Sequence, residues 1–130
     1  MDLTVVNSVS GTGITTITKT TTITVDAFDK VTEVDVAGLA TNFEIAVSPG
    51  TKALIKLVFM YADSYVEVVP GTPDLTVRFN TAVDPPIQLG GPLCLLEGLD
   101  DAIENCDSIF VSNAGASTRT ISVFVGRNTS

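Results

Sequence analysis

The sequence predicts an all-β fold, a β-sandwich of jelly-roll-like type, formed by one domain over residues 1–130. Three observations support this prediction. Threonine and valine, which favour strands, are abundant, whereas tryptophan and histidine are absent. Several segments alternate apolar and polar residues with the period of two that a half-buried strand requires. Clusters of turn residues recur at intervals of about 8–12 residues, which is typical of a sandwich or barrel.

The first two strands are expected to form a long hairpin. Residues 3–9 and 14–25 are rich in strand-forming side chains, and Ser10-Gly11-Thr12-Gly13 between them supplies a glycine-containing turn. Residues 15–24 are mostly threonine, whose methyl groups pack on a sheet while the hydroxyl groups bond across it. We therefore expect residues 15–24 to lie at a sheet edge, where they can bond to a neighbouring chain.

Three later segments show the clearest alternation, and each is expected to turn one face toward a core. Their inward-facing sets are Phe43, Ile45 and Val47, then Leu75, Val77 and Phe79, then Ile121, Val123 and Val125. Residues 53–61 differ because they are apolar on both faces, which indicates a central strand or a strand whose outer face meets a partner. The candidate assembly surface therefore combines one face of this segment with two residues of the N-terminal hairpin: Ile17, Ile23, Leu54, Val58 and Met60.

The remaining segments complete the sandwich. Residues 65–69 and 109–112 are predicted strands that end at clusters of turn residues, and residues 87–89 form a further strand after the rigid connection Pro85-Pro86. At most one short helix is expected, near residues 97–106, where apolar residues recur at helical spacing.

The composition indicates a protein that binds other proteins. The chain is 45% hydrophobic and 17% charged, whereas an average soluble protein has roughly 25% charged residues. The surplus of apolar residues has to lie on the surface or be covered by another chain, so we expect a homo-oligomer. A net charge of −8 and a pI near 4.1 disfavour binding to nucleic acid. No apolar run approaches the roughly 20 residues that span a bilayer, so no membrane partner is expected.

No catalytic residues are predicted. The absence of histidine excludes the commonest general base and every catalytic triad built on imidazole. The glycines of Gly11-Thr12-Gly13 and Gly90-Gly91 lack the neighbours that a phosphate-binding loop needs, so turn formation explains them. The sequence therefore predicts a protein that is not an enzyme and that needs no cofactor.

Two groups of reactive residues leave alternatives open. Residues 97–107 contain five carboxylates that could hold Ca²⁺, but their spacing does not match a known calcium loop, and we favour a solvated acidic turn with no metal. The pair Asp26 and Asp29 is expected in a loop between strands. The start of the chain has no readable signal peptide, so we expect synthesis in a cytoplasm, where Cys94 and Cys106 would be free thiols. A bridge formed later, outside the cell, is the alternative.

Residues 107–115 and 118–125 resemble the last two strands of many small virion proteins of tailed phages, the class that includes capsid decoration (cement) proteins. The resemblance implies a β-sandwich in the virion that binds the major capsid protein or other virion subunits. It also implies a trimer, since many decoration proteins trimerise. One alternative is a carbohydrate- or receptor-binding module of a phage tail or fibre, which would use Tyr61 and Tyr65. A bacterial surface or pilus-like subunit is the other.

Overall fold

The structure, a computed structural model, describes residues 1–47, 54–79, 81–83, 85–96 and 108–129. These residues form twelve strands and no helix, which confirms the all-β prediction. The strands are β1 (Asp2–Val9), β2 (Ile17–Thr24), β3 (Ala27–Val36), β4 (Phe43–Ile45), β5 (Ile55–Ala62), β6 (Glu67–Val69), β7 (Thr72–Pro73), β8 (Leu75–Phe79), β9 (Ile87–Gln88), β10 (Leu93–Leu96), β11 (Ile109–Asn113) and β12 (Arg119–Arg127). The short helix expected near residues 97–106 lies outside the described residues.

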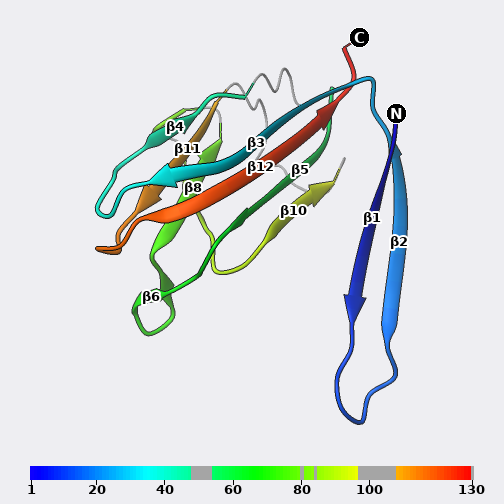
Figure 1. Cartoon of the computed structure of the whole chain (residues 1–130), viewed down its shortest axis with the longest axis horizontal. Coiled ribbons are helices and arrows are strands. Elements are labelled where there is room, and N and C mark those ends of the chain that lie inside the picture. Colours follow the sequence, from blue (N-terminus) through cyan, green and yellow to red (C-terminus); the bar gives the residue numbers. More distant parts are fainter. Residues whose placement is uncertain (48–53, 80, 84, 97–107, 130) are drawn as a thin grey trace.

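Eight of these strands form two four-stranded sheets that pack face to face (Figure 1). Sheet 1 has the order β10-β5-β12-β3, and sheet 2 has the order β4-β11-β8-β9. All neighbours in both sheets are antiparallel. The predicted β-sandwich is therefore confirmed. Strands β1 and β2 form a separate hairpin, as do β6 and β7.

The pairing of the sandwich strands is nested along the chain. Strand β8 pairs with β9, β5 with β10, β4 with β11, and β3 with β12. One long antiparallel ribbon that bends between β8 and β9 would contain the same pairs. When such a ribbon coils around itself, successive pairs of strands lie alternately in the two sheets. This is the arrangement seen here, with β8–β9 and β4–β11 in sheet 2 and β5–β10 and β3–β12 in sheet 1.

The core lies between the two sheets and is made of alternate residues from both. On β8 the residues Leu75, Val77 and Phe79 are buried, whereas the two between them are half-buried, so the alternation predicted for this strand holds. Strand β5 lies between β10 and β12 and is a central strand. The buried residues of the core are Val36, Ile45, Ile55, Val58, Met60, Ala62, Leu75, Val77, Phe79, Leu89, Ile109, Val111, Ile121, Val123 and Val125.

Strand β3 corrects one expectation. Asp26 and Asp29 were expected in a loop between strands, and Asp26 does lie in the connection between β2 and β3. Asp29 does not, because Ala27–Val36 is a ten-residue strand paired with β12. Asp29 is part of this strand, and its Oδ2 accepts a hydrogen bond from Nη1 of Arg127 at 2.6 Å. An irregularity opposite Ser122 interrupts the alternation along this strand. There the register shifts, and Glu33 adopts a positive φ of 57°.

A buried asparagine ties the two sheets together at one end of the sandwich. Asn113, at the end of β11, is 1% exposed. Its Nδ2 donates to the carbonyl oxygens of Val36 and Ala37, each at 3.3 Å, and of Ser117 at 2.8 Å. Its Oδ1 accepts from the backbone nitrogen of Gly115 at 3.0 Å. Because Val36 ends β3 in sheet 1 and Asn113 ends β11 in sheet 2, this one side chain joins both sheets.

An ion pair lies beside this asparagine. Asp74 is 2% exposed, and its Oδ2 lies 2.9 Å from Nε of Arg119, the first residue of β12. The backbone carbonyl of Asp74 accepts a hydrogen bond from the nitrogen of Ala114 at 2.7 Å. The residue that precedes β8 is thereby bound to the turn between β11 and β12.

Candidate assembly surface

Strands β1 and β2 form an arm that projects from the sandwich (Figure 1). They pair in register from Asp2 with Thr24 to Val9 with Ile17, which confirms the predicted hairpin. The turn at the tip contains Gly13 with a φ of 80°, a conformation that favours glycine. Among the described residues the arm has no strand partner outside itself, so β2 lies at an edge, as expected for the threonine-rich segment.

The arm has two different faces. Directly opposed residues of an antiparallel pair point to the same side. One side carries the pairs Leu3–Ile23, Val5–Thr21, Asn7–Lys19 and Val9–Ile17, and we call it the apolar arm face. The other side carries the pairs Thr4–Thr22, Val6–Thr20 and Ser8–Thr18, so it is mostly hydroxyl groups.

The base of the arm is fixed to the outer face of sheet 1. Two hydrogen bonds between Met1 and Val25, of 2.9 and 2.7 Å, close the arm at its base. The backbone nitrogen of the next residue, Asp26, donates to the carbonyl of Arg127 at the end of β12 at 3.1 Å, which attaches this base to sheet 1. A side chain at Gly126 of β12 would lie only 3.1 Å from both Leu3 Cδ1 and Val25 Cγ1. The absence of a side chain at this position is what lets the arm approach the sheet.

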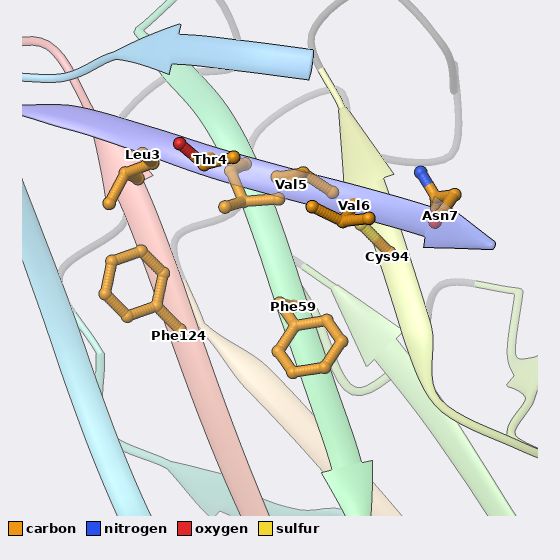
Figure 2. Close-up of a pocket in the computed structure, with 9 residues that line it drawn as sticks. Leu3, Thr4, Val5, Val6, Asn7, Phe59, Cys94 and Phe124 are labelled. Carbon is orange, nitrogen blue, oxygen red and sulfur yellow. The ribbon is translucent and has the colours of Figure 1, made fainter. Parts of the chain in front are cut away.

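A groove of about 370 Å³ runs between β1 and the outer face of sheet 1. Figure 2 shows Leu3 and Val5 of β1 above the rings of Phe124 and Phe59, with Cys94 on the β10 side. These three residues of the sheet lie in one cross-strand row, because Phe59 is opposite both Phe124 and Cys94. The arm therefore covers an apolar stripe that crosses three strands.

Beyond this groove the outer face of sheet 1 is open and aromatic. The rings of Phe28 and Phe124 are stacked with centroids 5.5 Å apart, and the rings of Phe59 and Tyr61 lie 5.8 Å apart. Phe28, Phe59 and Tyr61 remain 50%, 37% and 45% exposed. A second hollow, of about 250 Å³, lies between Phe59, Tyr61, Phe124 and Lys30. Large exposed aromatic groups that adjoin one another are typical of a surface that binds a partner.

The structure separates the five residues of the predicted assembly surface. Ile17 is 71% exposed near the tip of the arm, and Ile23 is half-buried near its base. Leu54 is half-buried just before β5. Val58 and Met60 are fully buried in the core, so their assignment to a surface is wrong.

The outward residues of β5 are instead Leu57, which lines the groove under the arm, and the exposed Phe59 and Tyr61. Both faces of this strand are apolar, and in a strand a shift of one residue exchanges the two faces. The local pattern therefore could not show which face meets the core.

The side chain of Tyr65 takes part in the packing of the fold. Its hydroxyl oxygen accepts a hydrogen bond from the backbone nitrogen of Ala62 at 2.9 Å, and its ring packs against the core. Of the two tyrosines considered for sugar binding, Tyr61 is therefore the exposed one.

Cys94 is a free thiol beside the groove, and burial raises the pKa of this thiol above its usual value. The thiolate fraction of Cys94 at neutral pH is therefore smaller than that of an exposed cysteine. Cys106 and the acidic residues 97–107 lie outside the described residues. Within the described part of the chain, no three Cys, Asp or Glu side chains are grouped as a metal site would require.

We expect folding to be independent of calcium. The sequence around residues 97–107 lacks a recognised calcium-binding spacing. Thermal unfolding measured in excess Ca²⁺ and in EDTA should then give melting temperatures within about 2 °C of each other, because a ligand that does not bind the native state does not stabilise it. A rise of many degrees in Ca²⁺ would instead assign a metal site to this acidic segment.

No family model, no curated protein and no solved structure matches the chain. In the described part of the chain there is no helix with the length and hydrophobicity needed to cross a membrane.

Proposed function

We propose that this protein is a non-enzymatic structural subunit of a virus particle, most specifically a decoration protein that binds the major capsid protein of a tailed phage. The observation that carries the proposal is the projecting arm. Its Val9, Ile14 and Ile17 are 61%, 56% and 71% exposed, although they belong to an otherwise ordered hairpin. A free monomer gains nothing from apolar side chains at the tip of an arm, whereas a subunit of an assembly can bury them.

The strand order supports the same class of protein. We infer that the nested pairing of eight strands in two sheets is a jelly-roll arrangement. Double-sheet jelly rolls include viral capsid domains and lectin domains, so this support is an analogy between folds. The two classes that the fold suggests are also the two that the sequence favours.

The mechanism would be the burial of apolar surface between subunits. A typical stable interface buries about 800 Å² on each partner. Burial of apolar surface contributes about 25 cal/mol per Å², from which the cost of association is subtracted. A subunit that bridges neighbouring capsid proteins in this way would raise the free energy needed to separate them. We propose a homo-oligomer, with a trimer as the favoured state.

Co-sedimentation with capsids is the direct test. The purified chain is mixed with empty capsids of the virus that encodes it, and bound protein is separated by a density gradient. We expect saturable binding with a fixed number of copies per capsid, and greater resistance of the decorated capsid to heat. A chain that neither binds these capsids nor occurs in purified particles would refute the proposal.

The second candidate is a carbohydrate-binding module, and the exposed ring of Tyr61 beside Phe59 favours it. Sugars stack on exposed aromatic rings, and the open half of the outer face of sheet 1 offers two of them. A glycan array is the discriminating experiment. Binding to a defined glycan that is lost in Tyr61→Ala, together with no binding to capsids, would favour this alternative over the decoration protein.

A further inference from the structure

The apolar arm face continues past the body of its own chain. Near the base, Leu3, Val5 and Ile23 are half-buried because they face the outer side of sheet 1. Toward the tip, the same face presents Val9 and Ile17, which are 61% and 71% exposed. Apolar residues thus occupy this face of the arm both near its base, where they pack on sheet 1, and near its tip. In the described part of the chain, no residues pack against the apolar side chains near the tip.

The outer face of sheet 1 is covered by the arm over only part of its area. The arm of the same chain lies over Phe124 and Cys94. The half around Tyr61 stays open and contains the hollow of about 250 Å³. The molecule therefore has two exposed apolar surfaces of the kind that pack together within one chain. One is the distal half of the apolar arm face, and the other is the open half of the outer face of sheet 1, around Tyr61.

The charges of the two half-faces are complementary. Residues 3–24 contain a single charged side chain, Lys19, which leaves a net charge of −9 on the rest of a chain whose total is −8. Lys19 lies on the apolar arm face, opposite Asn7. Asp35 and Asp63 are exposed at the open end of sheet 1 and lie on either side of β12. Tyr61 is close to them, because it is opposite Ser122 of the same strand.

A lysine also lies at this hollow, but acidic groups outnumber it. Lys30 contributes to the β3 side of the hollow. Glu33, Asp35 and Asp63 are all exposed at the same end of the sheet. The open half-face therefore has a net negative charge that fits a single incoming Lys19.

We propose that the distal half of the arm of one copy lies on the open half of the outer face of sheet 1 of a second copy. Ile17 and Val9 would then cover Tyr61 and the part of Phe59 that the arm of its own chain leaves exposed, with Lys19 directed toward the acidic end. Direct packing of two arms is disfavoured because it would bring two Lys19 side chains together on their apolar faces. The inference deepens the proposed function by naming one partner surface, but it is tested without capsids, so the two can fail separately.

The first test compares substitutions on the two faces of the arm. Ile17→Lys changes the apolar arm face, and its neighbour Thr18→Lys makes the same charge change on the threonine face. Both positions are exposed, so neither change should unfold the chain. Sedimentation velocity over a range of concentrations should show about tenfold or greater weakening of self-association for Ile17→Lys and little change for Thr18→Lys. A wild-type chain that stays monomeric, or equal effects of both substitutions, would overturn the inference.

The second test identifies the two surfaces in contact. One chain carries Ile17→Cys and another carries Tyr61→Cys, both with Cys94→Ser and Cys106→Ser so that no other thiol reacts. Mild oxidation of the mixture should form a disulfide-linked pair that contains one chain of each kind. Thr18→Cys in place of Ile17→Cys should give no such pair. Cross-links only between two Ile17→Cys chains would show that arms contact arms, and would reject the proposed surface.

Discussion

Replacing Asn113 with aspartate is expected to lower the free energy of unfolding by about 3–5 kcal/mol, although the change exchanges one NH₂ group for one oxygen. In the native chain, Nδ2 of Asn113 is surrounded by the carbonyl oxygens of Val36, Ala37 and Ser117 at 2.8–3.3 Å. A carboxylate would place a negative oxygen against the same three acceptors in a site that is 1% exposed. Three carbonyls would lose their donor, and a charge would be buried without a partner.

Urea denaturation at one fixed protein concentration measures this effect. The midpoint should fall while the slope stays constant, because the substitution changes stability and not the surface exposed on unfolding. Asn7→Asp is the matched control, since it makes the same chemical change at an exposed position on the arm. At a protein concentration at which the chain is monomeric, it should shift the free energy of unfolding by less than about 0.5 kcal/mol. Equal effects at the two positions would show that Asn113 does not join the sheets.

Replacing Gly38 with alanine is expected to cost about 3 kcal/mol or more. Gly38 follows β3, and a methyl group at this position would overlap the backbone carbonyl of Ala116 in the turn between β11 and β12. The obstacle is backbone and not a flexible side chain, so one of the two turns has to move. That movement would strain the neighbouring hydrogen bond from the nitrogen of Leu39 to the carbonyl of Gly115, which measures 2.9 Å.

Gly91→Ala provides the comparison for this second substitution. A methyl group at Gly91 would meet no atom within 4 Å, and the backbone there does not have a positive φ. Thermal unfolding should therefore show a fall of roughly 10 °C for Gly38→Ala and almost none for Gly91→Ala. Similar melting temperatures for the two variants would mean that the turns beside Gly38 adjust without cost.

Both substitutions act at the same end of the sandwich. Asn113, Gly38 and the pair Asp74–Arg119 hold together the ends of β3, β8, β11 and β12, which are far apart in the sequence. Neither the identity of these four residues nor the sequence around them indicated that they would be in contact. Each contact depends on where the two sheets meet, and local periodicity carries no information about that.

The candidate assembly surface could be predicted only in part, for a related reason. Ile17 was identified correctly as an exposed apolar residue of a hairpin, because an isolated hairpin is defined by its own two strands and their turn. The choice between the two apolar faces of β5 was wrong. Burial of Val58 and Met60 depends on the sheet that packs against them, whereas both faces look equally apolar along the chain.

By itself, the sequence determined the strand-rich fold, the N-terminal hairpin with its glycine-containing turn, and the acidic and apolar composition of the chain. These follow from period-two alternation, β-branched side chains and glycine-containing turns, all of which act between residues close along the chain. The tertiary structure decided that Ala27–Val36 is a strand, which face of β5 is buried, and that half of the apolar arm face extends beyond the sandwich. Those outcomes depend on which distant segments pair and pack, and their free energy comes from contacts that no local pattern contains.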